Sequence, residues 1–195
     1  MAIFGGLFFD EKGEKTIYEV QNALASAGVE PVSSISDVPP HITIHISSSG
    51  DLRRWESGIT RAVENHPLLE INVSHVGWFP SASVLFLAPV VPDQLKSIYR
   101  MTVQSLAESS GSPGMVRDRV NWVPHITLAL SMADGLIEKA LKIAGRKIPI
   151  NLAADRLSIG SLVDQTVGST FRRPGARPAI AAWGVGDTCR SRAAG

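Results

Sequence analysis

Two copies of the tetrapeptide Pro-His-Ile-Thr are the residues of this chain best suited to chemistry. Their histidines, His41 and His125, lie 84 residues apart, and their threonines are Thr43 and Thr127. In an extended strand residues i and i+2 face the same side, so each histidine shares a face with its threonine. The isoleucine between them points to the other side, toward a core. Two such strands lining one groove would bring together two imidazoles and two hydroxyls.

This set of side chains suits the cleavage of a phosphorus–oxygen bond. In-line attack needs a base on the incoming oxygen and an acid on the leaving oxygen, and an imidazole with a pKa of about 6.5 serves either role. The threonine hydroxyls can donate to the non-bridging oxygens, where charge gathers in the transition state. A lone His-x-Thr is common in strands, but its repetition favours a catalytic role for His41, Thr43, His125 and Thr127. No metal or other cofactor is required.

The secondary structure predicted around the motifs also repeats. Apolar periodicity and turn signals predict strands at 2–9, 40–47, 68–79, 83–89, 122–131, 148–162 and 179–185, and helices at 14–27, 51–65, 92–109 and 134–145. The order strand, helix, strand, helix, strand thus occurs twice, and one further strand follows. It predicts a tandem duplication within one domain, residues 1–195, with lobes of approximately 1–80 and 83–195 that are free to exchange strands.

The motifs resemble a known signature. His41-Ile42-Thr43-Ile44 and His125-Ile126-Thr127-Leu128 are similar to the paired tetrapeptides of the 2H phosphoesterase superfamily, which includes 2′-5′ RNA ligase-like proteins and RNA 2′,3′-cyclic phosphodiesterases. The resemblance implies an α+β, bilobal fold of two antiparallel sheets flanked by helices, with the motifs lining a central cleft. It also implies metal-independent chemistry on cyclic phosphates or 2′-5′ linkages of RNA or small nucleotides.

Three functions remain open from the sequence. The first is hydrolysis of a 2′,3′-cyclic phosphate or a related nucleotide phosphodiester. The second is 2′-5′ RNA ligation, which uses a 5′-hydroxyl as the nucleophile in place of water. The third is a nucleotide- or RNA-binding module without significant turnover, against which the two intact His-Thr pairs argue.

Other side chains are candidates for substrate binding. His45 follows Thr43 on the predicted strand face, while Trp122 and Phe9 offer rings on which a base could stack. Arg117, Arg119, Arg172 and Arg173 could bind phosphate, the last two within a predicted loop between the final strands. Each also has an ordinary structural interpretation, in the core or on the surface. His41 and His45 cannot share a metal, because four residues of strand span about 13 Å.

The composition excludes several classes of protein. The chain has 195 residues, of which 44% are hydrophobic and 19% charged, as in ordinary globular proteins. Its formal net charge of +1 provides no field that would attract nucleic acid or membranes. The single cysteine, Cys189, suits a reducing compartment, and no signal peptide or membrane span is evident. We therefore expect a cytoplasmic monomer that acts on a nucleotide or an RNA end.

Overall fold

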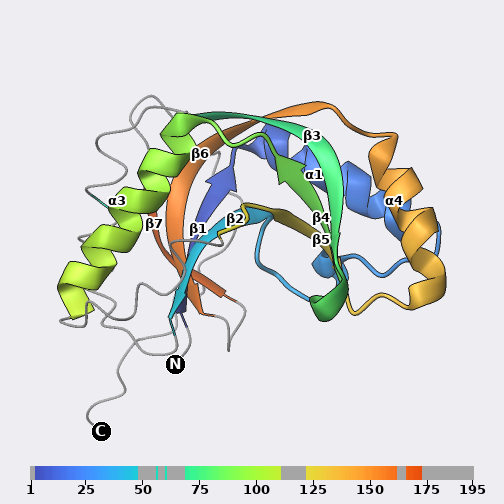
Figure 1. Cartoon of the computed structure of the whole chain (residues 1–195), viewed down its shortest axis with the longest axis horizontal. Helices are drawn as coiled ribbons and strands as arrows, with labels where there is room; N and C mark the ends of the chain where they lie inside the picture. Colours follow the sequence, from blue (N-terminus) through green and yellow to red (C-terminus); the bar gives the residue numbers. More distant parts are fainter. Residues whose placement is uncertain are drawn as a thin grey trace, which may run out of the picture.

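Strands from distant parts of the chain form a single sheet with helices on both sides of the molecule (Figure 1). The computed structural model describes residues 3–47, 56, 60, 69–110, 122–161 and 166–172. Its elements, including the short 3-10 turns η1, η2 and η4, are β1 (Ile3–Phe9), α1 (Glu11–Ala25), η1 (Val32–Ser34), β2 (His41–Ser47), β3 (Leu69–Phe79), η2 (Pro80–Ala82), β4 (Val84–Pro89), α3 (Asp93–Ser110), β5 (Ile126–Leu130), η4 (Asp134–Leu136), α4 (Ile137–Gly145), β6 (Ile150–Ser161) and β7 (Thr166–Arg172).

The sheet has the strand order β1-β2-β5-β4-β3-β6-β7, and every neighbouring pair is antiparallel. A further pairing of β1 with β6 closes six of these strands into a ring. The twelve-residue strand β6 makes this closure because it pairs with β3 near its start and with β1 over its remaining length. The pairing around the ring is shortest between β2 and β5, where Ile42 and Ile126 are the one register pair.

The helices bury their apolar faces against this sheet. In Figure 1, α3 lies on one side of the molecule, and α1 and α4 lie together on the other. Helix α1 begins at Asp10, whose carboxylate accepts the N–H of Gly13 at 2.7 Å and so caps the first turn. Its buried positions Ile17, Val20 and Leu24 follow helical spacing. Within the described ranges, no helix is long and apolar enough to cross a bilayer.

Most of the predicted elements are confirmed. The structure has the α+β class, with an antiparallel sheet flanked by helices, and its strands and helices follow the predicted order within the described ranges. The two separate sheets of a duplicated fold are not confirmed, since all seven strands belong to one sheet. The division into lobes stays a prediction. The predicted helix at 51–65 and strand at 179–185 lie outside the described residues, apart from helical positions 56 and 60.

One predicted loop was wrong in part. Arg172 was expected to lie in the loop between the last strands, but its backbone and that of Phe171 belong to β7. Arg172 pairs there with Arg156 of β6, and Phe171 with Leu157. The segment Thr166–Arg172 ends in the first arginine of an Arg-Arg-Pro run, which is typical of a loop, but its β-branched residues favour a strand.

A glycine and a phenylalanine face each other across β3 and β4. Gly77 pairs with Phe86, and a Cβ atom added to Gly77 would lie 2.2 Å from Cζ of the Phe86 ring. The ring therefore lies over the glycine backbone, where a side chain would otherwise stand. This arrangement fixes the position of Phe86, which is 6% exposed and reaches the functional site.

Replacing Gly77 by Ala tests this packing. The methyl group displaces the Phe86 ring, and overpacking of this kind costs about 1–3 kcal/mol. We expect the free energy of unfolding, measured by urea denaturation, to fall by that amount in G77A. The matched control is G135A, because a Cβ at Gly135 meets nothing within 4 Å. Equal stability of G77A and G135A would contradict the packing described.

Candidate active site

The two Pro-His-Ile-Thr motifs meet where β2 and β5 adjoin. Ile42 and Ile126 are paired and fully buried, and the antiparallel register then sets His41 beside Thr127 and Thr43 beside His125. Directly opposed residues on such strands have Cβ atoms about 5 Å apart. The two histidines and two threonines predicted from the sequence are therefore brought together on one face of the sheet.

Both imidazoles are held in the same way by their own backbone. The Nδ1 of His41 lies 2.9 Å from the carbonyl oxygen of Pro39, and the Nδ1 of His125 lies 2.8 Å from that of Val123. A carbonyl oxygen only accepts, so in each ring Nδ1 carries the proton and donates it. The Nε2 atom is then the nitrogen that exchanges protons with a substrate. Two equivalent contacts thus give two equivalently prepared acid–base groups.

Each histidine ring lies against two phenylalanine rings. The ring centroid of His41 is 5.0 Å from those of Phe4 and Phe8 on β1. The centroid of His125 is 5.1 Å from that of Phe79 and 5.4 Å from that of Phe86, both in edge contacts. Such contacts restrict the rotation of both imidazoles.

A glycine makes room for each pair of rings. A Cβ atom at Gly6 would lie 2.9 Å from the Phe8 ring, 3.2 Å from the Phe4 ring and 3.2 Å from the ring of His41. Gly77 has the corresponding place beneath Phe86. The aromatic rings and the glycines together set where the two imidazoles stand.

The carbonyl groups of both threonines accept hydrogen bonds from side chains. Trp122 Nε1 donates to the Thr43 oxygen at 3.0 Å, and the buried Gln21 amide of α1 donates to the Thr127 oxygen at 3.4 Å. Trp122 and Gln21 thus hold β2 and β5 at the threonines, next to the single residue pair that joins the two strands. Gln21 was not predicted from the sequence, although a glutamine on the apolar face of a helix was a signal for it.

Trp122 packs against helix α3. Its ring stacks on Tyr99 of α3 with centroids 4.1 Å apart and planes 8° from parallel. Together with its hydrogen bond to Thr43, this contact makes Trp122 a link between α3 and β2. The base-stacking role expected from the sequence stays a prediction.

The predicted faces of His45 and Phe9 are corrected by the register. A bulge in β2 sets His45 opposite Gly5 and Thr43 opposite Gly6, and opposed residues share a face. Neighbouring positions on β1 face opposite sides, so His45 lies on the other face from Thr43. Phe9 is fully buried in the core, whereas Phe4 and Phe8 accompany His41.

The predicted phosphate-binding arginines remain predictions. Arg117, Arg119 and Arg173 lie outside the described residues. The backbone of Arg172 ends β7, where it pairs with Arg156. Among the described residues, no three His, Cys, Asp or Glu side chains are grouped so that they could hold a metal ion.

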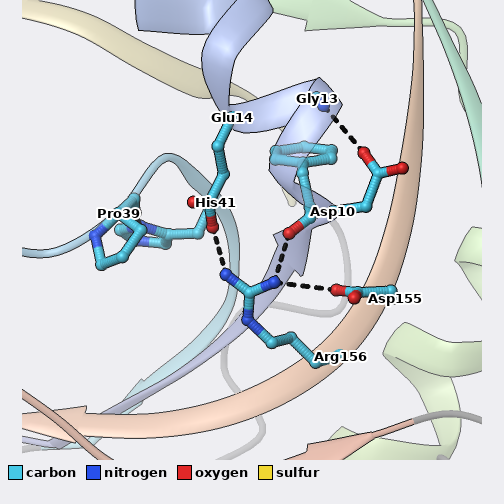
Figure 2. A network of polar contacts seen from close by, with 8 residues as sticks. Asp10, Gly13, Glu14, Pro39, His41, Asp155 and Arg156 are labelled. Carbon is cyan, nitrogen blue, oxygen red and sulfur yellow. Dashed lines mark hydrogen bonds and ion pairs between the residues drawn. The ribbon is translucent and has the colours of Figure 1, made fainter. Parts of the chain in front are cut away.

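Arg156 supports the first motif from β6 and was not predicted. Figure 2 shows its guanidinium between Glu14 of α1 and Asp155. It also donates to the Phe9 carbonyl oxygen, and its Cζ lies 5.7 Å from the centroid of Phe8, the ring that stacks on His41. The signal in the sequence was an Asp-Arg pair inside an otherwise uncharged strand.

The surroundings of the first motif hold His41 in its neutral form. Burial among the phenylalanine rings lowers the pKa of His41 to about 4, the hydrogen bond to Pro39 opposes this change, and the charge of His125 lowers the pKa further. A neutral His41 near pH 7 is ready to accept a proton.

Comparison with known protein families agrees with this arrangement. The family model of the 2′-5′ RNA ligase superfamily matches residues 7–165, a range that contains both motifs. The chain belongs to the 2′-5′ RNA ligase superfamily. The resemblance to 2H phosphoesterases seen in the sequence is thereby confirmed, and membership supports chemistry of the phosphoesterase or RNA ligase type. No curated protein matches the chain.

Solved structures show the same superfamily fold. The protein TT0787 of Thermus thermophilus is 17% identical, with a TM-score of 0.62 over 91% of this chain and 100% of its own. E. coli LigT, in crystals with ATP and with 3′-AMP, is 14% identical in each case, with a TM-score of 0.58 over 88% of this chain and 97% of its own. At these identities the likeness establishes the fold.

The low pKa of His41 predicts how stability depends on pH. The unfolded chain binds a proton on this histidine below about pH 6.5, whereas the folded protein does so only near pH 4, so stability falls as the pH falls through this window. A shift of one unit is worth about 1.4 kcal/mol. When the pH is lowered from 6.5 to 4.5, the free energy of unfolding should fall in both proteins. We expect the fall in His41→Gln to be smaller than the fall in the parent by about 1–2 kcal/mol. Urea denaturation at several pH values measures this difference, and parallel curves for the two proteins would contradict it.

Proposed function

We propose that this protein is a metal-independent phosphoesterase that hydrolyses a 2′,3′-cyclic phosphate or a related nucleotide phosphodiester. The observation that carries the proposal is the juxtaposition of two His-Thr pairs across β2 and β5, with Nδ1 of both histidines engaged by backbone carbonyl groups. Two Nε2 atoms on one face of the sheet supply the acid and the base of an in-line displacement. The nucleotide complexes of E. coli LigT, with ATP and 3′-AMP, support a nucleotide as the substrate.

The environments of the two histidines suggest their roles. His41 is held neutral near pH 7, so we assign to its Nε2 the removal of a proton from the attacking water. The Nε2 of His125 then gives a proton to the leaving ribose oxygen, and a phosphate monoester forms. The hydroxyl groups of Thr43 and Thr127 donate to the non-bridging oxygens as negative charge builds up on them. Proton exchange with solvent returns both imidazoles to their starting forms.

Ligation would use the same four residues with a different nucleophile. A 5′-hydroxyl in place of water would give a 2′-5′ linkage between two RNA ends. Affinity for RNA grows with the number of phosphates neutralised, and the formal net charge here is only +1. We therefore place hydrolysis before ligation.

Replacing either histidine by Ala tests the proposed acid–base pair. We expect H41A and H125A each to lose about 10²–10⁴ in turnover of 2′,3′-cyclic nucleotides, since each loses one acid–base group. His75→Ala is the control, because His75 is exposed on β3 and bonded to the neighbouring Ser74. Assays contain EDTA. An activity that chelation abolishes, or H125A with the parent turnover, would overturn the mechanism.

The threonines have a separate test. Thr43→Val and Thr127→Val keep the branched shape but remove one hydroxyl donor. We expect each to raise the activation free energy by about 1–3 kcal/mol, less than the loss of a sole oxyanion donor, with a nearly unchanged melting temperature. Thr→Ser at the same positions keeps the hydroxyl and restores most of the turnover. Full activity in both Val variants would make the threonines structural.

A further inference from the structure

A cavity of about 260 Å³ opens beside the first motif. His41 and Thr127 form the part of its wall nearest the proposed chemistry. Phe4 of β1, Leu130 of β5 and Ile35, which follows η1, contribute to the rest. A ligand whose phosphate lies on the catalytic residues therefore has a hollow directly next to that phosphate.

A bulge in β5 turns Leu130 toward this cavity. Phe86 is opposite Thr127 and Leu85 is opposite Ala129, so Leu128 has no partner on β4. The pairing partner of Leu130 is Val84, two positions along β4 from Phe86, so Leu130 shares the face of Thr127. Without the bulge Leu130 would point into the core beside Leu128.

The wall of the cavity is almost entirely apolar. Ile35 is 48% exposed and Leu130 37% exposed, so both present apolar surface that a ligand can cover. No Asp, Glu, Lys or Arg of the described residues lines it. Beyond the two motifs, Ser36 is the one polar side chain that the described residues contribute to the wall. Its oxygen accepts the N–H of Val38 at 3.2 Å, and its hydroxyl proton can be donated to a ligand.

We infer that this cavity is the subsite for the base of a single nucleotide whose phosphodiester lies on the two histidines. The inference rests on the proposed function and names the group that accompanies the phosphate. A nucleic-acid base is an uncharged planar ring system that gains from apolar contact over its faces. One base suits the size of the cavity. A second phosphate finds no cation there among the described residues.

The chemistry of the wall also sets its selectivity. One hydroxyl group cannot read the donor and acceptor pattern that distinguishes the four bases, whereas apolar contact accepts all of them. The subsite therefore distinguishes a nucleotide from a cyclic phosphate without a base. It does not distinguish adenine from uracil by more than about tenfold, the effect of 1.4 kcal/mol.

The test compares substrates with and without a base. Adenosine and uridine 2′,3′-cyclic phosphates share the reacting ring with glycerol 1,2-cyclic phosphate, which has no base. We expect Ile35→Ser and Leu130→Ser each to raise the KM for both cyclic nucleotides about tenfold and to change kinetics on glycerol cyclic phosphate less than twofold. Val90→Ser is the matched control, because Val90 is 51% exposed and does not line the cavity. It should behave as the parent toward all three.

The outcomes separate this inference from the proposed function. Equal effects of the cavity variants on substrates with and without a base, or no effect on either, overturn the subsite while hydrolysis stands. Absence of turnover on all three substrates overturns the proposed function. Calorimetry with adenosine 2′-monophosphate and glycerol 2-phosphate then decides the subsite alone. Weaker binding of the nucleotide only, in both cavity variants, supports it, and unchanged nucleotide binding overturns it.

Discussion

One buried residue pair, Ile42 with Ile126, holds the candidate active site together. It joins β2 to β5 within the ring of strands, and each of its residues stands between a histidine and a threonine. If β2 and β5 paired over more residues, less space would remain for a substrate between the motifs, on the face opposite Ile42 and Ile126. With no pairing, the two motifs would be positioned only by separate parts of the fold. The short contact allows closeness and access together, and Trp122 and Gln21 supply hydrogen bonds to the strands beside it.

The aromatic rings around the histidines orient both imidazoles, but they also make His41 a weaker base. Four phenylalanine rings limit the movement of the two imidazoles, and on the side of His41 they also exclude water. Poor solvation disfavours the imidazolium form, which is why the pKa of His41 falls to about 4. A phosphodiester anion beside His41 would offset this effect, since a nearby negative charge favours the protonated ring. Binding of substrate would thus itself adjust the strength of this base.

The sequence was sufficient for features that depend on local period. The alternation along Pro-His-Ile-Thr placed both histidines and both threonines on one face and the isoleucines behind them, and helical spacing identified the buried side of α1. It failed where a single residue changed the register. The bulge in β2 reversed the predicted face of His45, and the bulge in β5 sets the face of Leu130, although no residue type at either position indicates a bulge. The contacts of Trp122 with Tyr99, and of Arg156 with Glu14, join distant segments, so neither was visible in a local pattern.

The pairing of β1 with β6 has a consequence for how the chain is made. Phe4 pairs with Gly160, so β1 leaves the ribosome about 150 residues ahead of one of its two neighbours. At typical synthesis rates of about 5–20 residues per second, that edge of β1 is uncovered for about 8–30 seconds. Its apolar side chains and free backbone groups are then open to wrong partners. Strand β6, which completes the ring that carries the active site, is synthesised long after β1, so chaperone protection of β1 would matter most early in translation.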